Sequence, residues 1–244
     1  MPEVPLRGGS VNAVVRAGDT VRRRPAARAD FVHGLLAWFE RSGWAGAPRL
    51  LGMDERGREI LTYLDGHVPI DGLRPASTGS RAALARVAEL IREFHDLTAG
   101  TDLVGEAEVV CHNDLSPRNT VYRQCRDGIR PVAFLDWDLA APGRRIHDLA
   151  LACWQFLDLG PGVGDLPATA TLLRLMCDAY GTGERAELVD TVLWWQERCR
   201  HGIETAAEAG EPAMVRLRAG GVPERIHAAH RWVTEHRVEL EAAL

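Results

Sequence analysis

The order of the predicted elements favours an α+β fold with two lobes, a small β-rich one followed by a larger, mainly helical one. Short strand patterns dominate residues 1–66, and amphipathic helical patterns dominate residues 67–244. Runs of strands followed by runs of helices are typical of α+β chains, whereas regular alternation of the two would indicate a parallel sheet. With 244 residues, the chain is long enough to give both lobes an apolar core.

Two hairpins and one helix are expected in the first lobe. Four strand patterns, joined in pairs by glycine-containing turns, occupy residues 11–16, 20–24, 50–53 and 59–64. Between the hairpins, apolar residues recur at helical spacing over residues 30–41, and Ser42-Gly43 ends this segment. Asp65-Gly66 interrupts the pattern after the second hairpin. We expect the hinge between the lobes there, near residues 62–66.

Helices dominate the second lobe. Residues 80–97 form an amphipathic pattern, with Thr78 or Ser80 placed to cap its start. Short apolar strands are predicted at residues 108–111, 120–122 and 131–135. Further amphipathic helices are predicted over residues 147–157, 171–180, 185–209 and 223–244.

Composition excludes several classes of protein. The net charge is -5, and no block of like charge is longer than Arg22-Arg23-Arg24, so nucleic acid is not an expected partner. The five cysteines form no C-x-x-C pair, which argues against a zinc site or a disulfide framework. No run of 18 apolar residues occurs, and MPEVPLRGGS lacks the pattern of a signal peptide. We therefore expect a cytoplasmic protein without a membrane partner.

The chain contains no lysine, so all 29 of its basic residues are arginines. A Walker A phosphate-binding loop needs its lysine to reach the nucleotide phosphates. That class of nucleotide site is therefore excluded.

One polar loop carries a recognisable chemical pattern. Residues 110–119 read VCHNDLSPRN, in which an apolar strand leads into the skeleton H-x-D-L-x-x-x-N. This skeleton matches the catalytic loop of protein kinases, where the aspartate accepts the proton of the substrate hydroxyl and the asparagine binds Mg²⁺. Asp114 and Asn119 are the candidates for these roles. By itself, the pattern also fits a turn stabilised by an aspartate beside a buried histidine.

A second motif follows the next apolar strand. Asp136 leaves the strand directly, and Asp138 comes two residues later. Kinase chemistry requires another carboxylate ligand for Mg²⁺ after such a strand. We assign Asp136 to the metal and keep Asp138 as the second choice, since either residue also fits a turn or a solvent-exposed position.

Together, HNDLSPRN and VAFLDWDLAAPGRRIHDLA resemble the aminoglycoside phosphotransferase family, which is related to choline and homoserine kinases. The resemblance implies a bilobal protein-kinase-like fold and transfer of the γ-phosphoryl of ATP or GTP to a hydroxyl of a small molecule. It implies Asp114 as the catalytic base and Asn119 and Asp136 as ligands of Mg²⁺. His112 and Asp148 would support the site.

The N-terminal lobe matches this family more loosely. Val21 and Arg23 reproduce the spacing of the kinase strand on which a lysine contacts phosphate, so Arg23 is assigned that contact. The family pairs this cation with an acid on the following helix, and Asp30 is the only candidate for that acid in this chain. The complete set assigned to the nucleotide is Gly8, Gly9, Ser10, Arg23, Thr62, Tyr63 and Leu64.

Two other functions remain open at this stage. A nucleotide-binding module with weak or no catalysis is suggested by the missing lysine and the short glycine turn. A metal-dependent phosphohydrolase is suggested by an H…HD…D pattern made of His112, Asp114, His147 and Asp148.

The acceptor is the least defined partner. The helices at 185–209 and 223–244 lie where the family builds its substrate pocket, and Trp194-Trp195 offers rings for stacking or for the core. Acidic residues that could face a polycationic drug, or simply solvent, are Asp158, Asp165, Glu197, Glu204 and Glu208. The sequence leaves open the acceptor, the choice between ATP and GTP, and the oligomeric state.

Overall fold

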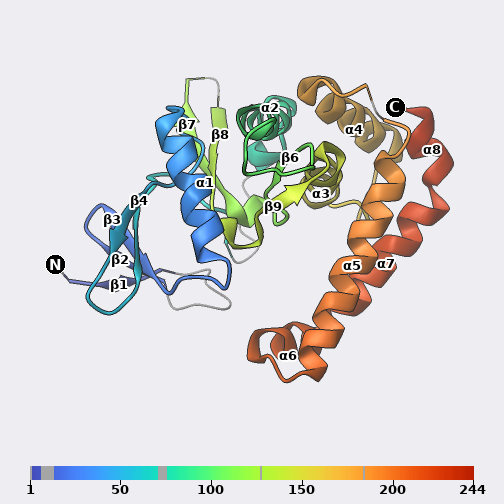
Figure 1. The fold of residues 1–244 in the computed structure, drawn as a ribbon. Coiled ribbons are helices and arrows are strands. Elements are labelled where there is room, and N and C mark those ends of the chain that lie inside the picture. The colour runs from blue at the N-terminus through green and yellow to red at the C-terminus, as the bar shows by residue number, and fades with distance from the viewer. Residues whose placement is uncertain (1, 7–13, 71–75, 127, 184) are drawn as a thin grey trace.

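The computed structural model describes the whole chain except residues 1, 7–13, 71–75, 127 and 184 (Figure 1). The predicted turn at Gly8, Gly9 and Ser10 lies outside the described residues. The α+β fold class is confirmed, with a β-sheet near the N-terminus and mostly helices after residue 144.

The N-terminal sheet is antiparallel, with the strand order β1-β2-β3-β5-β4. Its strands are β1 (Val4–Pro5), β2 (Val15–Ala17), β3 (Thr20–Arg23), β4 (Leu50–Met53) and β5 (Glu59–Thr62). Both predicted hairpins are present, because β2 pairs with β3 and β4 pairs with β5. Strands β3 and β5 also pair, in a register that sets Arg23 opposite Glu59.

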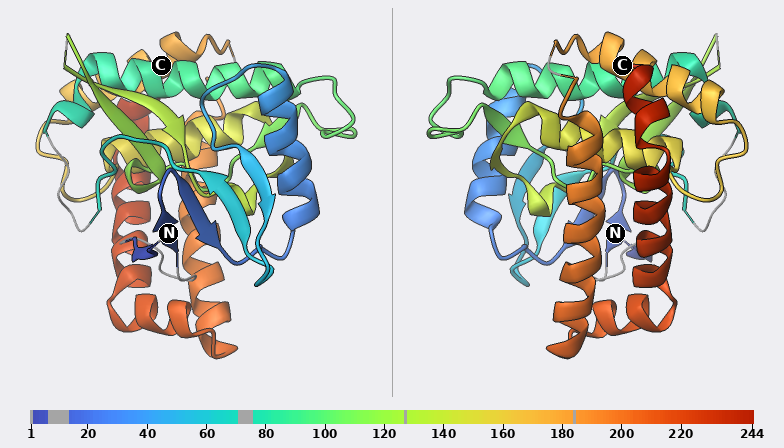
Figure 2. Two further views of the ribbon diagram at one scale, coloured as in Figure 1. Left: turned by 90° about the vertical axis from the view of Figure 1, so that its left-hand side faces the viewer. Right: turned by 90° about the vertical axis from the view of Figure 1, so that its right-hand side faces the viewer.

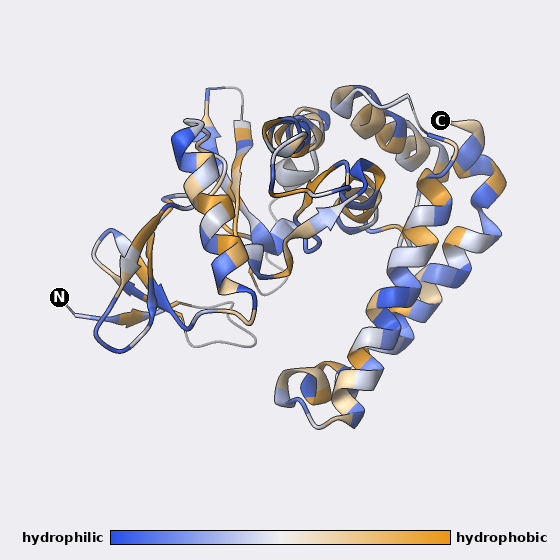
Figure 3. Cartoon of the chain, viewed as in Figure 1, coloured by the Kyte–Doolittle hydropathy of each residue, from blue (hydrophilic) through white to orange (hydrophobic). Residues whose placement is uncertain are grey.

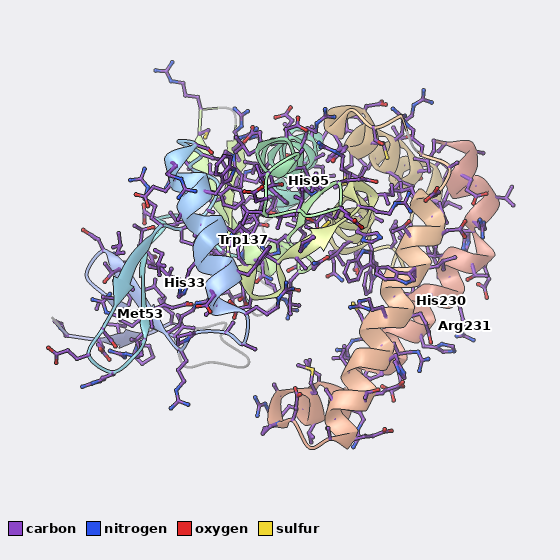
Figure 4. All side chains as sticks on the ribbon, viewed as in Figure 1. His33, Met53, His95, Trp137, His230 and Arg231 are labelled. Atoms are coloured by element: carbon purple, nitrogen blue, oxygen red, sulfur yellow. The ribbon has the colours of Figure 1, made fainter. Side chains whose placement is uncertain are left out.

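Helix α1 (Ala29–Arg41) lies between the sheet and the helical part (Figures 1 and 2). Its buried side chains are Val32, Leu35, Leu36 and Phe39. Phe39 lies 5.0 Å from the ring of Trp137, measured between centroids, and this contact joins the helix to the segment after Asp136. The labelled Trp137 lies near the centre of the molecule in Figure 4, and its side chain is fully buried.

The rest of the chain surrounds two short strand pairs with helices. Strand β6 (Val109–Cys111) pairs with β9 (Ala141–Gly143), and β7 (Thr120–Cys125) pairs with β8 (Gly128–Phe134). The long helices are α2 (Arg81–Thr98), α3 (Arg145–Leu157), α4 (Leu166–Tyr180), α5 (Leu188–Glu208) and α7 (Val222–Glu235). Ser80 caps α2 as expected, because its Oγ accepts a hydrogen bond from the backbone N–H of Ala83 at 3.2 Å.

Helices α5 and α7 run side by side, and the short α6 (Pro212–Ala219) lies at the far end of this pair (Figures 1 and 2). Hydrophobic and hydrophilic residues interleave along both long helices, as amphipathic helices require (Figure 3). None of the helices in the described part of the chain has the length and apolar character that a membrane crossing needs.

The helices after residue 157 differ from the prediction in three ways. Helix α4 begins at Leu166 rather than at residue 171, because Asp165 caps it by accepting from the N–H of Ala168 at 2.9 Å. Helix α6 was not predicted; Pro212 occupies its first turn, where a missing N–H costs little. The single helix expected over residues 223–244 is divided at His236 into α7 and α8 (Arg237–Ala242).

Candidate active site

The candidate catalytic loop begins where strand β6 ends. The strand is buried on both faces, and the chain turns at Asn113, whose φ of 64° lies in the left-handed region. Asparagine tolerates this conformation better than most residues, because its short polar side chain can bond locally. Here its Nδ2 donates to the carbonyl oxygen of Leu139 at 3.0 Å. The turn brings Asp114 out of the strand direction.

Asp114 and Asn119 contact each other directly. The side-chain nitrogen Nδ2 of Asn119 donates to Oδ2 of Asp114 at 2.7 Å and to the backbone oxygen of Asp114 at 2.8 Å. Because both bonds use the amide nitrogen, the amide oxygen is the atom of Asn119 suited to a cation. The loop therefore places a carboxylate and an amide oxygen beside each other.

Burial raises the pKa of Asp114 to about 7, and the negative charge of Asp136 adds to this effect. The hydrogen bond from Asn119 acts in the opposite direction. A carboxyl group with a pKa near neutrality is suited to accept a proton from a hydroxyl at physiological pH.

Asp136 follows strand β8 and has a φ of 61°, again in the left-handed region. Its side chain is 51% exposed, and Oδ1 lies 3.3 Å from Nη1 of Arg23. Partial burial of the carboxyl group and the neighbouring charge of Asp138 raise the pKa of Asp136, and Arg23 lowers it. Asp114, Asp136 and Asp138 thus repel one another electrostatically.

These residues fit Mg²⁺. Carboxylate and amide oxygens are the hard donors that this ion prefers. The raised pKa values of Asp114 and Asp136 arise partly from neighbouring carboxylates, and a divalent cation would relieve this repulsion. Asn119 and Asp136 would hold the ion, with Asp138 as a further donor.

Arg23 reaches the same carboxylates from the N-terminal sheet. Its side chain is only 10% exposed, and Nη2 lies 2.5 Å from Oδ1 of Asp138. The neighbouring Arg22 donates instead to Oγ1 of Thr20, at 2.8 Å. This contrast follows from the alternation of side chains along a strand.

The ion-pair partner of Arg23 corrects the expectation from sequence. Asp30 is not among the acids bonded to Arg23, although it lies in the first turn of α1. Instead, Oε2 of Glu59 on strand β5 accepts from Nε of Arg23 at 2.8 Å. The pairing of β3 with β5 causes this arrangement, and His33 of α1 bonds to the other carboxylate oxygen of Glu59 at 2.7 Å. Predicting Glu59 as the partner of Arg23 would have required the register in which the two hairpins pair, and the sequence does not show this register.

Asp148 braces the candidate catalytic loop from helix α3. Its fully buried carboxylate accepts the backbone N–H of His112 at 2.6 Å and that of Asn113 at 2.9 Å. It also bonds to Nε2 of His95, whose Nδ1 lies 2.8 Å from the hydroxyl of Tyr180. Burial alone would raise the pKa of Asp148, but the bonds with these partners hold it below its ordinary value. His95, labelled in Figure 4, and Tyr180 were not predicted from sequence.

Hydrogen bonds at both ring nitrogens hold the side chain of His112 in place. Nε2 bonds to the carbonyl oxygen of Leu135 at 3.0 Å, and Nδ1 accepts the N–H of Asp114 at 3.2 Å. Burial lowers the pKa of His112, which keeps the ring uncharged. Both nitrogens are therefore engaged within the chain. The ring of His147 stacks instead on Trp194, so the phosphohydrolase pattern does not form a ligand set here.

The predicted hinge is partly engaged in the sheet. The backbone N–H of Thr62 donates to the oxygen of Arg49, and that of Tyr63 donates to the oxygen of Asp19, both at 2.9 Å. Neither N–H is therefore available to a nucleotide base. The role of Leu64 at the hinge stays a prediction.

Most of the acids considered for the acceptor serve the chain itself. Glu197 and Glu204 both pair with Arg200, and Asp165 caps α4. Burial raises the pKa of Cys199 to about 11, and the charge of Asp114 contributes, so α5 passes close to the catalytic loop at Cys199. A polycationic acceptor would thus meet few unpaired carboxylates among these residues of α5.

The order of the strands, the catalytic-loop geometry and the second carboxylate after β8 define a protein-kinase-like fold. A sequence model described as "Phosphotransferase enzyme family" matches residues 99–188. The trifolitoxin immunity protein of Rhizobium leguminosarum bv. trifolii is 31% identical over 272 residues, covering 99% of this chain and 98% of that protein. The chain therefore belongs to this family, that of the aminoglycoside phosphotransferases, and is a phosphotransferase.

Solved structures agree on the fold. The GDP complex of aminoglycoside 2'-phosphotransferase-IIIa superposes with a TM-score of 0.61 at 13% identity, covering 97% of this chain and 93% of that one. A choline/ethanolamine kinase family protein from Mesorhizobium loti gives 0.58 at 16% identity, covering 96% and 92%. The aminoglycoside phosphotransferase APH(3'')-Id of Streptomyces rimosus, in complex with ADP and streptomycin, gives 0.59 at 16% identity, covering 79% and 90%.

Proposed function

We propose that the protein transfers the γ-phosphoryl group of ATP or GTP to a hydroxyl group of a small molecule, with Asp114 as the catalytic base. The observation that carries this proposal is the Asp114 carboxyl group, whose pKa is raised to about 7 beside the amide of Asn119. A proton acceptor of this strength, next to hard oxygen donors, suits a reaction in which a hydroxyl attacks a phosphate.

Asp114 would orient the acceptor hydroxyl and take its proton as the oxygen attacks the γ-phosphorus. The bond from that phosphorus to the β-phosphate oxygen breaks, and the nucleoside diphosphate leaves. Asn119 and Asp136 would hold Mg²⁺, which neutralises charge on the phosphates when bound. Arg23 would present its terminal nitrogens to the phosphates.

The bracing residues have a separate part in this proposal. Asp148 holds the backbone at His112 and Asn113, and His112 holds the N–H of Asp114. The loop therefore keeps its geometry without contacts from the substrate. Pre-organised groups of this kind lower the cost of reaching the transition state.

The acceptor we propose is a compound toxic to bacteria. Support comes from the printed names of the relatives, one a trifolitoxin immunity protein and several aminoglycoside phosphotransferases. Trifolitoxin stands first, because that relative is 31% identical over nearly the whole chain, whereas the three solved structures named above are at most 16% identical.

An acceptor screen tests this function. The purified protein is incubated with γ-labelled ATP or GTP, Mg²⁺ and trifolitoxin, aminoglycosides, choline or ethanolamine, and label is followed into the acceptor. We expect transfer to one acceptor class by the wild type and none by Asp114→Asn. Nucleotide binding without transfer to any acceptor would favour the noncatalytic nucleotide-binding module instead.

A further inference from the structure

Arg23 divides its five N–H donors among three different carboxylates. Nε donates to Glu59, Nη1 to Asp136 and Nη2 to Asp138. The contact with Glu59 therefore lies at the inner edge of the guanidinium. The two terminal nitrogens point toward the carboxylates of the candidate metal site.

Glu59 is almost fully buried, at 1% exposure, and both of its oxygens are bonded. Oε2 accepts from Arg23, and Oε1 lies 2.7 Å from Nε2 of His33. Burying a carboxylate is costly unless its oxygens have partners of this kind. The labelled His33 lies on the part of α1 next to the sheet (Figure 4). The contact thus links β3, β5 and α1 through a single carboxylate.

We propose that Glu59 and His33 are positioning residues that aim the two terminal nitrogens of Arg23 at the phosphates of the nucleotide donor. This inference rests on the proposed function. Glu59, on the strand beside Arg23, takes the role expected of an acid on α1, and the helix contributes His33 instead. Glu59 and His33 together thus take the place of the single helical acid that the sequence led us to expect.

The same geometry uses the shape of the arginine side chain. A guanidinium can be held at Nε while Nη1 and Nη2 remain directed at other groups, because its planar donors have fixed directions. A lysine ammonium can also contact a carboxylate and a phosphate, but as a point charge it lacks two terminal nitrogens that a bond at Nε can aim. Arg23→Lys should therefore restore only part of what Arg23→Ala loses.

A purely structural role for Glu59 would have a different consequence. If the contacts only fastened the sheet to α1, removing the charge would weaken binding of every ligand at the site. If they aim Arg23, the loss should be confined to ligands that carry phosphates. Comparing a nucleoside with its triphosphate separates these cases.

The test measures binding of Mg-ATP and of adenosine to the full chain by calorimetry or displacement, and Mg-GTP with guanosine if GTP is the donor. Glu59→Gln keeps the size of the side chain and removes its charge. We expect triphosphate binding about tenfold weaker, in line with one charge-assisted hydrogen bond, and unchanged nucleoside binding. His33→Ala should weaken triphosphate binding in the same selective way, and His33→Gln, which keeps an N–H donor, should restore it.

Asp54→Asn is the matched control, since Asp54 also pairs with an arginine at the same sheet, Arg58, but does not contact the candidate site. It should leave both affinities unchanged. Equal weakening of nucleoside and triphosphate by Glu59→Gln, or no weakening by either Glu59→Gln or His33→Ala, would overturn the inference. A wild-type protein that binds no triphosphate would instead refute the proposed function on which the inference rests.

Discussion

Asp114→Asn is the substitution for which stability and activity should move in opposite directions. The pKa of Asp114 is raised from 3.8 to about 7, chiefly by burial and then by the charge of Asp136. That difference is about three pH units, or about 4 kcal/mol at about 1.4 kcal/mol per unit. The folded state disfavours the ionised carboxyl group. The free energy of unfolding should therefore fall by up to this amount as pH rises from about 4 through 7.

The amide of Asp114→Asn removes the buried charge and keeps an oxygen that can accept from Asn119. Urea unfolding should show nearly equal stability of variant and wild type near pH 4. At pH 8 the variant should be more stable, by at most about 4 kcal/mol. Its kcat should fall by about 10² to 10⁴, the usual contribution of a general base.

The pH dependence of the wild type gives an independent measurement of the same group. Only the ionised carboxyl can accept the hydroxyl proton, so kcat/KM for the acceptor should rise with pH. The midpoint should lie at or below about 7, because bound Mg²⁺ would offset the charge of Asp136 that helps raise this pKa. Turnover of Asp114→Asn within a few-fold of wild type would refute the assignment. So would a variant that is less stable than wild type at pH 8, because Asp114 would then be stabilising as an ionised group.

Three further substitutions test other parts of the site and fold. Asp136→Asn should abolish most of the difference in nucleotide affinity between Mg²⁺ and a chelator, measured by titration calorimetry; a retained difference would place the metal elsewhere. Asp148→Asn should cost about 3 kcal/mol, because a buried acceptor of two N–H groups is impaired, and should lower the melting temperature by about 6 to 12 °C. Ser80→Ala should cost about 1 kcal/mol of stability through loss of the α2 cap, with turnover unchanged; an unchanged melting temperature would show that the cap contributes little.

The elements that sequence predicted well are those with local signals. Glycine-containing turns fixed both hairpins, and the periodicity of residues 30–41 anticipated α1 within one residue at its start. The pattern of residues 110–119 predicted one polar loop that carries both Asp114 and Asn119, and the structure shows the two side chains in direct contact. Asn119 comes five positions after Asp114, so a short turn suffices to bring the two side chains together.

Long-range contacts were beyond local patterns. Glu59 meets Arg23 only because β3 and β5 pair across the α1 segment, and the register of that pairing has no marker in either strand. His95 meets Asp148 because α2 packs against α3, which buries both side chains completely. In each case the chemistry depends on tertiary packing between segments that are more than 30 residues apart.

Phosphoryl transfer itself is best measured by ³¹P NMR. The protein is mixed with Mg-ATP or Mg-GTP and an acceptor from the screen, beginning with trifolitoxin, and the γ-phosphate signal is followed over time. We expect it to disappear as nucleoside diphosphate and a phosphomonoester of the acceptor appear in equal amounts, and to remain unchanged with Asp114→Asn. A signal that stays on the nucleotide with every acceptor, or that is converted only to inorganic phosphate, would contradict the assignment of the protein as a small-molecule kinase.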